Sequence, residues 1–168
     1  MFYIQLSLYG LLWMWLPLRH GQPIKNDLKA DAIVLSKILL TRIQEHPTQV
    51  KYASSLKSSG LDFIPDEQIL LSLEQIDEVL EVFQIILSNI PMEDVEQMLI
   101  DIENLRSVIQ LLNRIMGCMG REPKHLNIVE DLKEQHKNAS FTIEKVTLDR
   151  LQNSLQSIVQ HLDYITGC

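Results

Sequence analysis

Apolar residues recur at helical spacing in four separate stretches of this 168-residue chain. Side chains three and four positions apart lie on one face of an α-helix, so each stretch predicts an amphipathic helix. No stretch alternates apolar and polar residues as a β-strand does, and the sequence therefore indicates an all-α protein. The predicted stripes are Leu28, Ala32, Leu35, Leu39 and Ile43; Ile76, Val79, Leu80, Phe83, Ile86, Leu87 and Ile90; Val95, Leu99, Ile102, Leu105, Ile109, Leu112 and Met116; and Val146, Leu151, Leu155, Ile158, Val159, Leu162 and Ile165.

Start and stop signals frame the first two stripes. Asn26 is expected to cap the first helix, and Pro47 ends it because proline cannot continue a helix. Ser72 and Gln75 form a capping box before the second helix, in which Ser72 accepts from the backbone N–H of Gln75 and Gln75 reaches back. Pro91 ends the second helix.

The third and fourth helices carry weaker signals. Glu93 and Asp94 are expected in the first turn of the third helix, where negative charge is favourable, and Gly117 and Gly120 are expected to end it. Thr142 is a candidate N-cap for the fourth helix. The polar connection before it predicts only a short helix, at Ile128, Val129 and Leu132.

The lengths of the connections predict the topology. Only a few residues join the second and third helices, so these must be antiparallel neighbours. The other two connections are each about 25 residues, enough to run the length of a helix that is about 30 Å long. This pattern predicts an up-up-down-down four-helix bundle with two long crossovers, the arrangement of growth hormone and cytokine bundles.

The chain has two cysteines, Cys118 near the end of the third helix and Cys168 at the last residue. A bond between them would close a loop of roughly 50 residues and contribute about 4 kcal/mol on the chain-entropy model. It would also place the protein outside the reducing cytosol. The alternative is a pair of unrelated free thiols.

The N-terminal segment favours the same compartment. Residues 1–18 carry no charged side chain and include the apolar run from Leu11 to Leu16, which Arg19 and His20 follow. We interpret residues 1–21 as a secretory signal peptide and residues 22–168 as one helical domain, with an uncleaved membrane anchor as the alternative. The predicted localisation is secreted and extracellular.

Composition and motifs argue against several functions. The chain has a formal net charge of −7, which argues against binding to nucleic acid or to an anionic membrane surface. No phosphate-binding glycine loop, metal-ligand spacing or catalytic elbow is present, so we expect no cofactor, no metal and no enzyme activity. The histidines of the domain, His46, His125, His136 and His161, are not paired at metal spacing. Asn138 begins an N-glycosylation sequon in a predicted loop.

Apolar residues outside the core stripes are the remaining functional signal. On the first helix, Val34 and Ile38 lie beside the core edge; on the third, Ile100, Val108 and Leu111 lie away from it, next to Gln97, Asn104 and Ser107. Apolar side chains mixed with neutral polar ones are typical of a protein interface. The alternative is a wide core stripe or isolated exposed apolar residues.

The segment Gly60-Leu61-Asp62-Phe63-Ile64-Pro65 is unusually apolar for a connection. Its large side chains would either pack under the crossover or form a second contact patch. The same hexapeptide resembles the long-loop signature of leptins, and further matches follow in order along residues 22–168. These are Pro23-Ile24, Thr41-Arg42-Ile43, Glu103-Asn104-Leu105-Arg106, Arg150-Leu151-Gln152, Ser154-Leu155-Gln156 and the terminal Gly167-Cys168.

The resemblance implies a secreted, monomeric cytokine hormone that binds a class I cytokine receptor, activates it and regulates energy balance and food intake. It also implies two receptor-binding surfaces. The first uses Asp31, Lys37, Arg42, Gln97 and Asn104, with Val34, Ile38, Ser107 and Val108 at positions where the familiar side chains differ. The second uses Leu61, Asp62, Phe63 and Ile64 with Thr142 and Ile143, although Phe141 and Ile143 depart from the usual pattern. The alternatives are another class I helical cytokine and a secreted helical carrier.

Overall fold

The computed structural model describes residues 21–48, 60–66, 69–118 and 127–168. The regular elements of this part are α2 (Gly21–Glu45), α4 (Leu73–Asn89), α5 (Val95–Met116), α6 (Ile128–His161) and a 3-10 turn, η2 (Leu162–Tyr164). The described residues contain no strand, as the hydrophobic pattern predicts. Among them, no helix combines the length and apolarity needed to span a bilayer. The predicted signal peptide lies almost wholly outside the described residues and stays a prediction.

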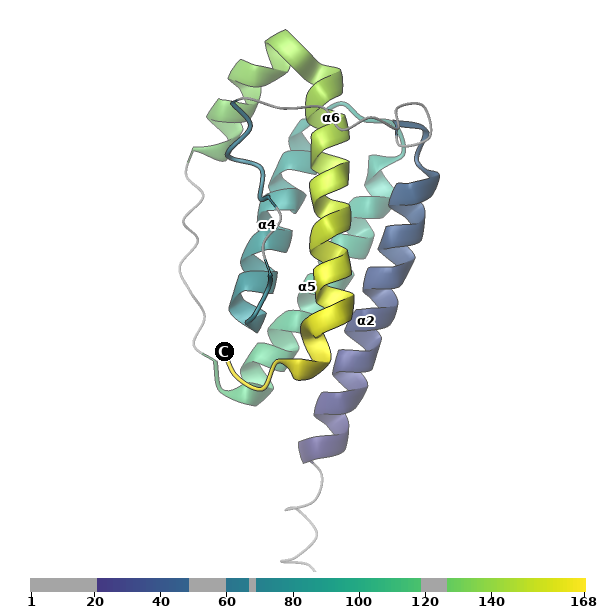
Figure 1. The fold of residues 1–168 in the computed structure, drawn as a ribbon, viewed down its shortest axis with the longest axis vertical. Coiled ribbons are helices and arrows are strands. Elements are labelled where there is room, and N and C mark those ends of the chain that lie inside the picture. Colours follow the sequence, from purple (N-terminus) through teal and green to yellow (C-terminus); the bar gives the residue numbers. More distant parts are fainter. Residues whose placement is uncertain (1–20, 49–59, 67–68, 119–126) are drawn as a thin grey trace, which may run out of the picture.

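The helices form an up-up-down-down bundle (Figure 1). α2 and α4 run upward in this view, and α5 and the long final part of α6 run downward. α2 packs against α5 and α6, and α4 packs against the same two helices. Each of these neighbouring pairs is antiparallel, and α5 lies parallel to the final part of α6. The fold predicted from the connection lengths is therefore confirmed.

Two predicted helix starts are wrong. α2 is helical from Gly21, the first described residue, so Asn26 lies inside the helix and does not cap it. The fourth helix does not begin at Thr142, and the predicted short helix at Ile128, Val129 and Leu132 is not separate from it. Both segments belong to α6, whose first part (green in Figure 1) reverses direction at the top of the bundle before the long arm descends. Asn138 consequently lies within α6 and not in a loop.

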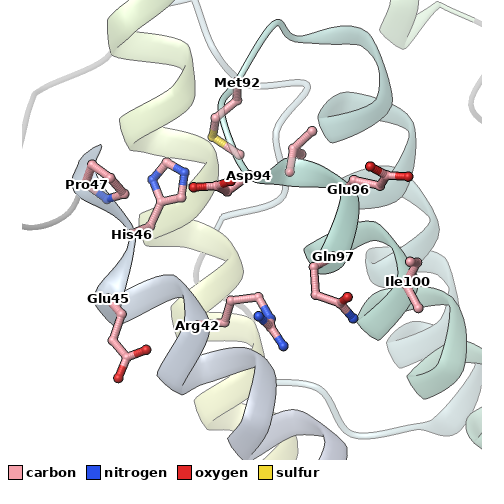
Figure 2. Close-up of a pocket in the computed structure, with 10 residues that line it drawn as sticks. Arg42, Glu45, His46, Pro47, Met92, Asp94, Glu96, Gln97 and Ile100 are labelled. Carbon is pink, nitrogen blue, oxygen red and sulfur yellow. The ribbon is translucent and has the colours of Figure 1, made fainter.

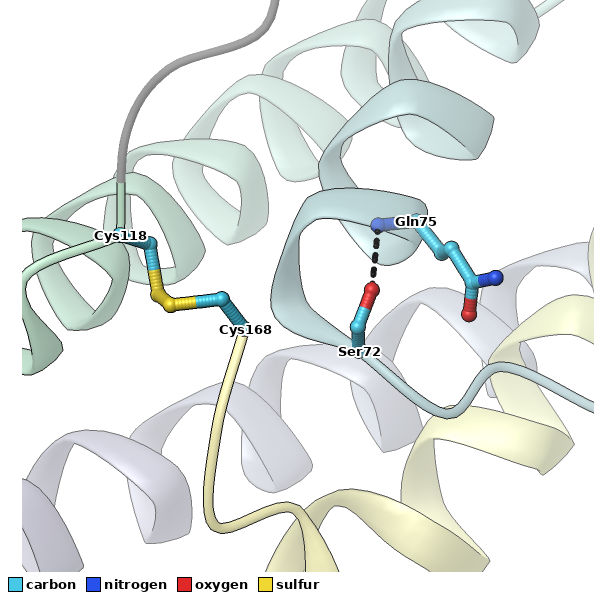
Figure 3. Close-up of a disulfide and its surroundings, with 4 residues drawn as sticks. All are labelled: Ser72, Gln75, Cys118 and Cys168. Atoms are coloured by element: carbon cyan, nitrogen blue, oxygen red, sulfur yellow. Dashed lines mark hydrogen bonds between the residues drawn. A yellow bond between two sulfur atoms is a disulfide. The ribbon is translucent and has the colours of Figure 1, made fainter.

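The capping box at the start of α4 is confirmed in part. Ser72 Oγ accepts from the backbone N–H of Gln75 at 3.2 Å, which Figure 3 shows. Gln75 Oε1 accepts the backbone N–H of Leu71 at 3.0 Å, one residue before the N-cap. Asp94 precedes α5 in the left-handed region, with a φ of 55°, so it is not in the first turn as predicted.

α5 ends at Gly117, which also adopts a left-handed conformation, with a φ of 77°. Its N–H donates to Arg114 O at 3.2 Å, and the N–H of Cys118 donates to Asn113 O at 2.9 Å. These two bonds are the Schellman pattern of a helix C-terminus. Gly120, the second predicted stop, lies outside the described residues.

The predicted stripes form one continuous core, with two corrections. Met98 and Leu148 are fully buried although neither was in a predicted stripe. The stripe residues that are only partly buried are Leu28, Leu35, Val95, Leu99, Met116 and Val159. The sequence pattern explains both additions: Met98, Ile102, Leu105, Ile109 and Leu112 alternate by four and three residues, as do Leu148, Leu151, Leu155, Ile158 and Leu162.

The predicted disulfide is confirmed. Cys118 and Cys168 are bonded, with their Cα atoms 5.5 Å apart (Figure 3). Lys29 holds the preceding tail, because its ammonium donates to Asp163 O at 3.1 Å and to Ile165 O at 2.7 Å. The C-terminal residues are thereby fixed to α2 as well as to the end of α5.

Candidate functional site

An ion pair sets the register between α2 and α5. Arg42 Nε donates to Asp101 Oδ2 at 2.7 Å, and Gln97 Nε2 donates to Asp101 Oδ1 at 3.1 Å. In antiparallel helices, this pairing places Ile38 and Val34 level with successive turns of α5 beyond Asp101. The outward residues of the two helices therefore form one continuous surface.

We call this surface the main face. Its members are Asp31, Val34, Lys37, Ile38 and Arg42 of α2 and Gln97, Ile100, Asn104, Ser107, Val108 and Leu111 of α5. Val34 is 55% exposed and Ile38 is 45% exposed, so the predicted outward positions are confirmed. Of the α5 residues, only Val108 is partly buried against the core.

The main face has a further apolar member that we did not predict. Ile115 is exposed and lies one turn beyond Leu111 on α5. Its four-residue spacing from Leu111 is the signal that could have found it. Large exposed aliphatic side chains at this density are unusual on a surface that contacts only water.

A cavity of about 760 Å³ lies at one end of the main face (Figure 2). Arg42 and Gln97 point into the space between α2 and α5. The lining comprises Arg42 and Glu45 of α2, His46 and Pro47 just after it, and Met92, Asp94, Val95, Glu96, Gln97 and Ile100 from the segment before α5 and its first turns. The main face therefore ends in a depression with acidic side chains around it.

The long-loop segment differs from its predicted arrangement. Leu61 is 4% exposed and Ile64 is 1% exposed, so their side chains belong to the core and not to a contact surface. Asp62 is exposed and Phe63 is partly buried. We call Asp62 and Phe63 the loop tip. The predicted interface role of Leu61 and Ile64 is thus corrected, because burying them anchors the segment.

Arg150 of α6 holds this segment in place. Its Nη1 donates to Leu61 O at 2.9 Å and to Ile64 O at 2.6 Å. The N–H of Ile64 donates to Leu61 O at 3.2 Å and closes the turn that presents the loop tip. Arg150 Nε also lies 3.5 Å from a carboxylate oxygen of Asp66.

The predicted partners of the loop tip on α6 also change. Ile143 is fully buried, so it offers no side-chain surface, and Thr142 is partly buried. The loop tip instead lies beside the first part of α6, where it shares a cavity of about 220 Å³ with Asp131, Glu134 and Gln135. The unpredicted bend of α6 brings these residues there, so spacing along the sequence gave no signal for them.

A cluster of ionisable groups lies where the ends of α2, α4 and α5 meet α6. Partial burial raises the pKa of Glu144, while His136 and His46 act to lower it and Glu93 to raise it. His46 itself is buried, and Nε2 of His136 is buried without a hydrogen-bond partner. His46, Glu93 and Glu144 help to line a cavity of about 350 Å³.

The described residues contain no group of histidine, cysteine or carboxylate side chains that could hold a metal ion. His125 lies outside the described residues. An apolar helix face, a preformed loop tip and a disulfide-fixed bundle are features typical of a binding protein.

Comparison with known proteins agrees. The family model described as Leptin matches residues 23–168. The chain is 34% identical to leptin of Macaca mulatta over 163 residues, which cover 96% of this chain and 98% of the macaque protein. It is 35% identical to leptin of Bubalus bubalis over 162 residues (96% and 97%) and 33% identical to human leptin over 163 residues (96% and 98%).

Proposed function

The chain belongs to the leptin family, and we propose that it is a secreted hormone that binds and activates a class I cytokine receptor of the leptin-receptor type. The family is one of hormones, which accords with the absence of catalytic motifs from the sequence. Signalling of energy stores and control of food intake are the physiological outputs that we propose. The disulfide supports secretion, because such bonds persist in oxidising compartments.

The observation that carries this proposal is the exposed apolar content of the main face. Val34 and Ile38 protrude from α2 opposite the outward turns of α5, where Ile100 and Leu111 are also exposed. On α5 the neighbouring members of the main face, Gln97, Asn104 and Ser107, are neutral and polar, while on α2 the charged members Asp31, Lys37 and Arg42 could pair with a receptor at the rim. We propose that the main face is the primary receptor-binding surface.

The loop tip is proposed as a second receptor-binding surface. Its turn is closed by a hydrogen bond and anchored by two buried side chains and Arg150, so little ordering is needed on binding. Thr142 remains a proposed contributor. A hormone with two separate surfaces can hold two receptor chains together, which is the event that we propose starts signalling.

Binding to a panel of class I cytokine-receptor ectodomains tests the proposal. We expect the hormone to bind the leptin receptor ectodomain through its main face, with saturable 1:1 stoichiometry. We expect no comparable binding to the other ectodomains. Replacing Asp62 and Phe63 by alanine should leave that binding intact and abolish signalling in receptor-bearing cells. Preferential binding to another class I receptor would support the alternative cytokine function, and stoichiometric uptake of a fluorescent lipid would support a carrier.

A further inference from the structure

His46 joins the end of α2 to the segment between α4 and α5. Its Nε2 lies 2.9 Å from Glu93 O, and the backbone N–H of Thr48 lies 3.3 Å from its Nδ1. A backbone N–H can only donate, so Nδ1 must accept and must carry no proton. The proton therefore sits on Nε2, which donates to the carbonyl. The observed pair of hydrogen bonds requires a neutral imidazole.

The same side chain lies between two cavities. His46, Pro47 and Met92 line both the cavity at the end of the main face and the cavity beside Glu144. Figure 2 shows His46 just beyond the end of the helix that carries Arg42, with Met92 and Asp94 nearby; all four residues line the first cavity. A movement of the His46 side chain would consequently alter the wall of the depression at one end of the main face.

We propose that His46 is a pH-sensitive latch that is closed when neutral and opens when protonated, which weakens receptor binding at the main face. This inference rests on the receptor-binding function proposed above. A protonated imidazole has a donor on each nitrogen, so Nδ1 can no longer accept from Thr48. Two donors would face each other, and either the ring must turn or residues 47–48 must move away.

The charged surroundings favour such a rearrangement. The titratable and charged groups around His46 come from four elements: Arg42 and Glu45 of α2, Glu93 and Asp94 between α4 and α5, Glu96 of α5, and His136 and Glu144 of α6. Carboxylates outnumber cations among them and would attract an imidazolium once it forms. Protonation of the imidazole is the event that would open the latch, so acidification is the perturbation that tests it.

The receptor measurement compares dissociation from the leptin receptor ectodomain at pH 7.4 and pH 5.5. Loss of one hydrogen bond predicts about a five-fold faster dissociation at pH 5.5 that depends on His46. H46Q keeps an N–H donor toward Glu93 O but does not titrate. The five-fold acceleration of dissociation at pH 5.5 should therefore be absent from H46Q. The matched control is H161Q, which removes a histidine whose Nδ1 lies 2.9 Å from Ser157 O on the same helix. Equal acceleration by acid in H46Q and in the unmodified hormone would overturn the proposal.

A second measurement needs neither the receptor nor a variant. Nitrogen-15 NMR of the free hormone should show His46 in the Nε2–H form at pH 7.4, with the Thr48 amide losing protection from exchange as His46 gains its second proton. A Thr48 amide that stays protected, or a His46 that stays neutral at pH 5.5, would overturn the latch. Absence of receptor binding at pH 7.4 would instead count against the proposed function. The NMR measurement on the free hormone would still test the latch in that case.

Discussion

Replacing Arg150 by methionine tests how the loop tip is held. Methionine keeps an unbranched stem of similar length in a site where the arginine side chain is only 14% exposed. It removes the donors that reach Leu61 O and Ile64 O at 2.9 and 2.6 Å. The contact with Asp66 is lost too, but that carboxylate is 71% exposed and such pairs contribute little.

The expected cost follows from the two carbonyl bonds. A hydrogen bond to a charged group contributes about 1.5–3 kcal/mol. Both acceptors belong to one turn that can move toward water together, so the two losses do not add fully. We therefore expect R150M to lower the free energy of unfolding by about 3 kcal/mol. R150K keeps the charge on a single donor nitrogen but lacks the planar fork of arginine, and it should lose about half as much.

Urea unfolding followed by circular dichroism measures this change, with hydrogen exchange at the Ile64 amide as the local readout. That amide closes the turn by donating to Leu61 O and should lose protection in R150M. R114M is the matched control, because Arg114 is exposed on α5 and its loss should change stability by less than about 0.5 kcal/mol. Unchanged stability and an unchanged Ile64 amide in R150M would refute the role assigned to Arg150.

Three further predictions follow from other contacts. Arg106 pairs with Asp77 at 3.0 Å and donates to Gln84 at 2.7 Å, so R106M should lower the free energy of unfolding in urea by about 2–3 kcal/mol, against a near-zero change in R114M. The double variant C118S/C168S should lose about 4 kcal/mol in the same assay, and a loss below 1 kcal/mol would contradict the loop-closure account. Burial raises the pKa of Glu144, so the folded protein binds this proton more tightly than the unfolded chain does. The resulting stabilisation is complete below the unfolded-state pKa near 4.5, and it is lost as the pH rises through the folded-state pKa. E144Q should therefore raise the melting temperature at pH 7 and have less effect at pH 4; equal shifts at both pH values would show that its ionisation is not the cause.

The hydrophobic pattern was sufficient to predict the bundle and its topology. Stripes at helical spacing locate the four helices, and the contrast between one short and two long connections allows only a few arrangements. The bond between Cys118 and Cys168 was predicted from the positions of the two cysteines, and the topology is consistent with it. Exposed residues such as Val34 and Ile38 were also predictable, because their angle around the helix axis depends on sequence position alone.

Features that depend on tertiary contacts could not be predicted in this way. Nothing near Leu61 or Ile64 in the sequence indicates that Arg150, more than 80 positions away, holds their carbonyl groups. The burial of Ile143 and the contact of the loop tip with Asp131 both depend on the bend of α6. Helix propensity and capping residues describe where a helix can begin but not where packing reverses its direction.

Receptor affinity of a main-face variant tests the central claim most directly. V34D/I38D places two carboxylates among the exposed aliphatic residues of the main face, and I69D/L71D makes the same change at two aliphatic positions outside it that are even more exposed. Losing the burial of two aliphatic side chains should cost about tenfold in affinity each. At pH 7.4 we predict that V34D/I38D binds the leptin receptor ectodomain about 100-fold more weakly than the unmodified hormone, while I69D/L71D binds as tightly. A folded V34D/I38D hormone that retains full affinity would contradict the account.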